Sequence, residues 1–66
     1  MNKPETIMRR EQVEAATGLR RSTIYELMAQ GLFPQSINIG ARAVGWLESE
    51  VQAWIHNKIE QSRKVA

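Results

Sequence analysis

EQVEAATGLRRSTIYELMAQG, residues 11–31, decides the fold because it contains two short helical patterns separated by a turn. In the first pattern Val13 and Ala16 lie three residues apart, on one face of a short helix. Gly18 follows, and glycine tolerates the positive φ with which many helices end. Leu19 can then fill the angle between the helices. Two short helices joined by a tight turn that contains glycine are typical of a helix-turn-helix.

The second pattern is an apolar stripe at i, i+3 and i+4, formed by Ile24, Leu27 and Met28. Gly31 is the expected residue after the end of this helix, and Pro34 prevents its continuation. The sequence therefore predicts helices at about residues 10–17 and 21–30.

Polar side chains that suit a nucleic acid surround the start of the second helix. Its first turn carries two guanidinium groups, two hydroxyls and a phenol, from Arg20, Arg21, Ser22, Thr23 and Tyr25. Such groups bind phosphates and base edges, and the N-terminal half of a recognition helix is the part that enters the major groove. We therefore expect these residues to contact double-stranded DNA. Glu26, on the outer face, either accepts from a cytosine amino group or only shapes the local charge.

Several of these residues also have a purely structural interpretation. Surface arginines are most often solvated, and Ser22 or Thr23 can serve as an N-terminal cap. Tyr25 can be a half-buried packing residue. For Tyr25 we favour a phosphate contact through its hydroxyl, with the ring packed against a neighbouring hairpin.

SINIGARAVGW, residues 36–46, changes the period from that of a helix to that of a strand. β-Branched and aromatic residues alternate with small or polar ones on both sides of the loop Gly40-Ala41-Arg42, which predicts a short β-hairpin with one face on the helices. Arg42 lies at the expected tip. A single arginine there suits the narrow minor groove or its phosphates, although it can also be an ordinary turn residue.

A third helix is predicted at about residues 47–61 by apolar residues at i, i+4, i+7, i+8 and i+12: Leu47, Val51, Trp54, Ile55 and Ile59. Residues 6–8 form either a short strand or an apolar lead-in. We expect residues 1–5 to be disordered and residues 62–66 to fray.

The predicted fold is mostly α with a small β-hairpin, a winged helix-turn-helix that occupies residues 6–61 as one domain. Its expected core consists of Val13, Ala16, Leu19, Ile24, Leu27, Met28, Phe33, Ile37, Ile39, Val44, Trp46, Val51, Trp54 and Ile55.

Length and composition exclude several classes of function. The chain has 66 residues, no cysteine and one histidine. It can therefore form neither a disulfide nor a thiolate metal site, and it lacks the residues for Cys/His catalysis. We see no nucleophile or acid–base constellation and expect no enzyme activity, cofactor or metal. No apolar run approaches a transmembrane length, and no secretory leader is evident, so we expect a soluble cytosolic protein.

Charge distribution is more informative than the net charge of +2. Between residues 20 and 45 there are three basic residues, all arginine, and one acidic residue. Arginine carries the planar fork that binds phosphates and guanine bidentately. This distribution favours the second helix and the hairpin as the DNA-binding elements.

The run from Gly18 to Ile55 resembles the AlpA-like phage regulatory proteins, small winged-helix DNA-binding proteins related to phage excisionases and, more distantly, to MerR-type domains. The matching elements are Thr17-Gly18-Leu19, Arg21-Ser22-Thr23-Ile24-Tyr25, Gly31 with Phe33-Pro34, Gly40 with Arg42-Ala43-Val44 and Trp46, and Glu48-Ser49-Glu50-Val51 with Trp54. In that family a serine usually precedes the Arg-Ser-Thr run. Here Arg20 stands in its place and adds a charge.

The resemblance implies a prophage-borne regulator that binds promoter or attachment-site DNA, and with it a bacterial cytoplasmic, nucleoid-associated location. One such domain reads few base pairs, so useful specificity requires cooperative binding or a dimer on DNA, with a second copy as partner. An alternative is an excisionase-type architectural factor, a recombination directionality factor that bends its site. A third hypothesis, from another class, is a protein-interaction module whose outer helix face binds another chain.

Overall fold

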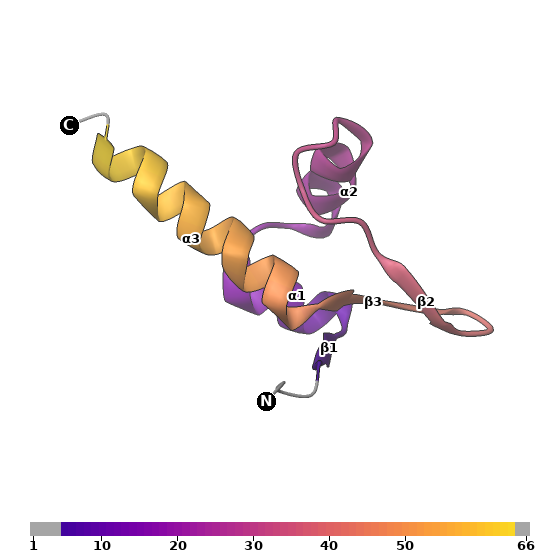
Figure 1. Cartoon of the computed structure of the whole chain (residues 1–66). Coiled ribbons are helices and arrows are strands. Elements are labelled where there is room, and N and C mark those ends of the chain that lie inside the picture. Colours follow the sequence, from indigo (N-terminus) through magenta and orange to yellow (C-terminus); the bar gives the residue numbers. More distant parts are fainter. Residues whose placement is uncertain (1–4, 65–66) are drawn as a thin grey trace.

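The computed structural model describes residues 5–64 and contains three helices and three strands (Figure 1). In chain order the elements are β1 (Ile7–Met8), α1 (Arg10–Thr17), α2 (Arg21–Ala29), β2 (Ile37–Gly40), β3 (Ala43–Leu47) and α3 (Glu48–Lys64). The fold is mostly helical with a small antiparallel sheet and a β-hairpin, which confirms the predicted class and is consistent with a winged helix-turn-helix. Of the segment expected to be disordered, residues 1–4 lie outside the described range.

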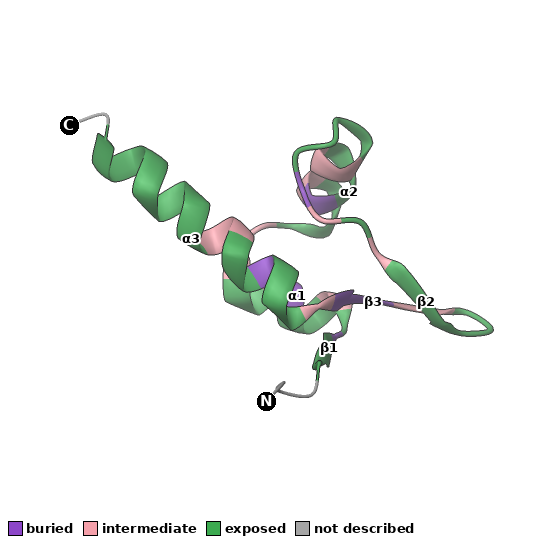
Figure 2. Ribbon diagram, in the orientation of Figure 1, coloured by how far each residue is buried: buried purple, intermediate pink, exposed green. Residues whose placement is uncertain are grey.

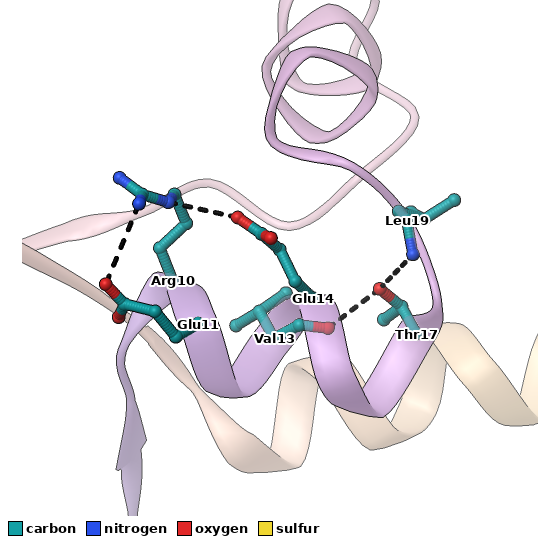
Figure 3. A network of polar contacts seen from close by, with 6 residues as sticks. All are labelled: Arg10, Glu11, Val13, Glu14, Thr17 and Leu19. Atoms are coloured by element: carbon teal, nitrogen blue, oxygen red, sulfur yellow. Dashed lines mark hydrogen bonds and ion pairs between the residues drawn. The ribbon is translucent and has the colours of Figure 1, made fainter.

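α1 has only eight residues, too few for a helix to be stable without tertiary contacts. Local polar contacts support it (Figure 3). The backbone N–H of Arg9 donates to Gln12 Oε1 at 2.8 Å, and Arg10 Nε donates to Glu14 Oε2 at 3.0 Å. Gly18 ends the helix with a φ of 76°, and its N–H donates to the Glu14 carbonyl.

β3 is the central strand of the sheet, whose order is β1-β3-β2. Ile7 pairs with Leu47 on one side of it, and Ile37 pairs with Gly45 on the other. Residues 6–8, predicted as a strand or a lead-in, therefore contribute a strand. Gly45 is required because a Cβ there would collide with the Ile7 side chain and lie 3.2 Å from the Met8 carbonyl oxygen.

The core lies where α1, β3 and the first turns of α3 meet (Figure 2), and Ile24 of α2 belongs to the same cluster of buried residues. Six apolar residues from five elements and the loop after α2 are buried: Met8, Val13, Ile24, Phe33, Trp46 and Val51. Partly buried residues surround them: Leu19, Leu27, Met28, Val44, Trp54 and Ile55. Trp46 is fully buried, and its indole N–H donates to the Pro34 carbonyl at 3.1 Å.

Three residues predicted for the core are exposed. Ile37 and Ile39 on β2 are 38% and 37% exposed, and Ala16 on α1 is also exposed. The alternation of β2 is that of a strand with one covered face, but the hairpin projects beyond the helices that were expected to cover it (Figures 1 and 2). Its apolar residues therefore remain at the surface.

Three helix boundaries also differ from the prediction. α2 ends at Ala29, and α3 begins at Glu48 and continues to Lys64, three residues beyond the predicted end. No glycine or proline interrupts residues 61–64, and Arg63 and Lys64 suit the negative end of the helix dipole. Within the described residues, no helix is long and apolar enough to cross a bilayer.

Replacement of Trp46 by alanine is expected to lower the free energy of unfolding by about 3–5 kcal/mol, because it empties the largest fully buried site. That loss is comparable to the whole stability expected of a domain of this size, about 3–10 kcal/mol. Urea unfolding followed by circular dichroism measures it. Trp54→Ala, at a half-buried site, is expected to lose less, and equal losses would contradict this description of the core.

Candidate nucleic-acid interface

The turn between α1 and α2 sets the orientation of α2 relative to α1. Thr17 Oγ1 donates to the Val13 carbonyl at 2.8 Å and accepts from the Leu19 N–H at 3.2 Å (Figure 3). Gly18 supplies the left-handed conformation between them. Leu19 packs against the core, as predicted for a residue that fills the angle between the helices. One hydroxyl thus links the end of α1 to the approach of α2.

The C-terminus of α2 is fixed by a Schellman motif. Gly31, with a φ of 73°, donates its N–H to the Met28 carbonyl at 3.0 Å, and Leu32 donates its N–H to the Leu27 carbonyl at 2.8 Å. Gln35 Nε2 also donates to the Met28 carbonyl. The C-terminus of α2 is therefore fixed by backbone hydrogen bonds, and the turn that precedes the helix is fixed by the Thr17 hydroxyl.

The N-terminus of α2 is electropositive. Arg20 occupies the N-cap position with an extended backbone and makes no capping hydrogen bond through its side chain, and the first turn carries no acidic residue. The helix begins at Arg21, so two guanidinium groups flank the positive end of the helix dipole. Both arginines are exposed. Such an end attracts anionic phosphate groups.

Arg21 is part of a stack that connects the surface to the core. Its guanidinium carbon lies 5.8 Å from the centroid of the Tyr25 ring, and that ring meets Trp46 edge-on with centroids 6.2 Å apart. Tyr25 is 37% exposed, whereas Trp46 is fully buried. The ring of Tyr25 thus packs against β3 of the hairpin, as predicted, and lies within cation–π distance of Arg21.

Sequence reasoning predicted that the Tyr25 ring contacts the hairpin, but it missed Trp46 as the partner and the contact of Arg21 with the ring. Arg21 and Tyr25 are spaced i, i+4, which is a signal for contact on a helix surface. Nothing in the sequence indicated that Trp46, 21 positions further along, would support the tyrosine ring.

The remaining predicted contact residues lie at the surface of α2 and at the hairpin tip. Ser22 and Glu26 are exposed and Thr23 is half-buried. Among residues 5–64, no side-chain hydrogen bond engages Ser22 or Thr23, so neither acts as the alternative N-cap there. Arg42 is exposed in the turn between β2 and β3, on a hairpin that projects from the body (Figure 1).

None of the predicted contact residues is committed to an ion pair in the described part of the chain. Both ion pairs found there belong to Arg10, which contacts Glu11 at 3.6 Å and Glu14 at 3.0 Å. The guanidinium groups of Arg20, Arg21 and Arg42 therefore keep their charge available to an outside partner. The arrangement is that of a small helix-turn-helix module with a basic hairpin.

Comparison with known proteins identifies the family. Residues 6–59 match the family described as "Prophage CP4-57 regulatory protein (AlpA)", and the chain belongs to that family. Its description is that of a regulatory protein and not of an enzyme class.

Two curated relatives are similar to the chain. It is 46% identical to the "Uncharacterized protein ORF88" of Enterobacteria phage P4 over 55 residues, which are 83% of this chain and 62% of that protein. It therefore spans about three fifths of the length of ORF88. It is 31% identical to the "DNA-binding transcriptional activator AlpA" of Escherichia coli strain K12 over 58 residues, covering 79% of this chain and 83% of that protein.

Replacement of Thr17 by valine is expected to destabilise the domain by about 1–2 kcal/mol, because the Leu19 N–H loses its acceptor while the side chain keeps its shape. Urea unfolding of the variant measures the change. Thr17→Ser keeps the hydroxyl and is the matched control. If the valine variant proves as stable as the serine variant, the hydroxyl does not stabilise the turn.

Proposed function

We propose that this chain is a sequence-specific double-stranded DNA-binding transcriptional regulator of a prophage or mobile element. In this proposal α2 is the recognition helix in the major groove, and the β2–β3 hairpin reaches the adjacent minor groove with Arg42. The observation that carries it is the basic start of α2, which is exposed and makes no ion pair within residues 5–64, on a helix whose preceding turn and C-terminus are fixed by hydrogen bonds.

The chemistry of the α2 surface supports a duplex as the partner. Arg20 and Arg21 can neutralise phosphates, and the fork of Arg21 can bind a guanine bidentately. Arg21 lies over the ring of Tyr25, which itself packs on Trp46, and a cation–π contact of this kind favours side-chain positions near the ring and so lowers the entropy lost on binding. A tyrosine hydroxyl at this site can donate to a phosphate oxygen.

The comparisons support the same conclusion. The family is described as a prophage regulatory protein, and the AlpA relative is named as a DNA-binding transcriptional activator. Both descriptions fit a module whose exposed arginines lie on a helix start and a hairpin tip. A module that binds another protein through the outer face of α2 would not require those two separate basic sites.

Arg21→Ala is expected to weaken binding to the preferred duplex by about 1–3 kcal/mol and to relax its sequence preference, because a bidentate base contact is lost. Fluorescence anisotropy with duplex fragments from the surrounding genomic region measures both effects. Arg21→Lys keeps the charge but not the fork, and Arg63→Ala on α3 is the control for net charge. Binding that is insensitive to salt and to Arg21→Ala would instead favour a protein-interaction module.

Arg42→Ala is expected to reduce affinity for all duplexes, because one phosphate contact is removed. The fall of log affinity with log salt concentration should become less steep by about one. The melting temperature should stay unchanged because Arg42 is exposed and makes no ion pair within residues 5–64. Anisotropy at several salt concentrations and thermal unfolding test this. A fall in melting temperature of several degrees would identify Arg42 as a structural residue.

A further inference from the structure

A groove of about 790 Å³ lies between α3 and the loop that connects α2 to β2. Its floor is fixed by two contacts of Trp54. The indole N–H of Trp54 donates to the Leu32 carbonyl at 2.8 Å, and its ring packs edge-on against Phe33 with centroids 5.0 Å apart. The groove is therefore formed before any partner binds, which lowers the cost of binding one.

The loop wall of the groove is apolar and exposed. Leu32 is 56% exposed, the highest value among the large apolar residues described, and Ile37 at the start of β2 is 38% exposed. Both line the groove. Exposed apolar residues that line a preformed depression are typical of a surface that binds another macromolecule.

The helix wall carries a charge pattern that is symmetric about Trp54. Glu50 lies four residues before Trp54 and Lys58 lies four residues after it, and all three line the groove. The ammonium of Lys58 lies 5.5 Å from the centroid of the Trp54 indole. Neither Glu50 nor Lys58 forms an ion pair within the described residues.

An antiparallel copy of the same helix complements this pattern. With a two-fold axis at Trp54, Glu50 of each copy faces Lys58 of the other, about 6 Å along the helix from the axis on either side. Two ion pairs then form from one self-complementary surface, as a two-fold interface requires.

The segment from Glu50 to Lys58 is about two turns of helix long, and both of its ends line the groove. In the symmetric arrangement each α3 packs along the partner's groove, over its Trp54 floor, so both grooves are covered at once.

We propose that the groove between α3 and the residue 31–37 loop binds α3 of a second copy of this chain, forming an antiparallel two-fold dimer. This surface shares no residue with the predicted DNA-contact set, so dimerisation is independent of DNA binding. A contact confined to about two turns of α3 and one loop is smaller than a standard interface of about 800 Å² per partner. The free dimer is therefore weak and forms at high micromolar or higher protein concentration.

Charge reversal tests the proposal by analytical ultracentrifugation of the whole chain without DNA. The wild type should dimerise. Glu50→Lys and Lys58→Glu should each weaken dimerisation by at least about tenfold, because like charges then face each other twice. The double variant, Glu50→Lys with Lys58→Glu, should restore it, because each pair is remade with its signs exchanged. Glu60→Lys and Arg63→Glu are the matched controls on α3 outside the groove.

Crosslinking supplies a second readout, because the chain contains no cysteine. Ala53→Cys, in the groove beside the proposed axis, should crosslink to its own copy with a short bismaleimide. Gln52→Cys, which does not line the groove, should not. Circular dichroism confirms that each variant is folded.

Three results would overturn the proposal. The wild type stays monomeric at millimolar concentration, or the single charge-reversal variants dimerise as strongly as the wild type. In the third, the double variant is folded but does not regain dimerisation. Duplex binding measured by anisotropy on a single short site tests the proposed function separately, since a monomer suffices for it.

Discussion

The burial of Trp46 is the contact on which the rest of the structure depends. This residue lies on the central strand, pairs with Met8 of β1, donates its indole N–H to the loop after α2, and supports the ring of Tyr25. A domain of about this length buries only about 60% of its unfolded surface, so one large side chain that touches several elements carries much of the cooperativity. Because Tyr25 in turn contacts Arg21, the same residue connects the stability of the core with the placement of the basic helix start.

The helices and the hairpin could be predicted because their signals are local. The i, i+3, i+4 spacing on α2, the positive-φ glycines after α1 and α2, and the alternation around Gly40-Ala41-Arg42 each act within a few residues. The structure agrees with these signals at the level of element order and class. Gly45 shows the limit of this reasoning. Position 45 has no room for a Cβ because β1, far away in the sequence, packs against it.

The errors arose where burial depends on how elements are placed in space. Ile37 and Ile39 have the alternation of a covered strand, yet the hairpin extends beyond the helices. The groove at Trp54 was also missed, because its walls come from segments ten or more positions apart. For the candidate site, residue types at a helix start and a turn indicated which side chains are exposed, but the stack that positions Arg21 required the structure. Their contacts with DNA remain a prediction.

Exposed apolar residues on such a small chain fall into two groups with different consequences. Ile39 lies on the projecting hairpin, where a nearby duplex would cover part of the surface, whereas Leu32 and Ile37 line a groove whose charges match those of its own copy. The proposed DNA-contact residues and the groove residues are different sets, so a substitution can alter one without altering the other. Under both proposals a weak dimer links two domains that each bind DNA weakly. Once one domain is bound, the dimer contact raises the effective concentration of the second domain near the DNA, which strengthens binding without any new contact to the bases.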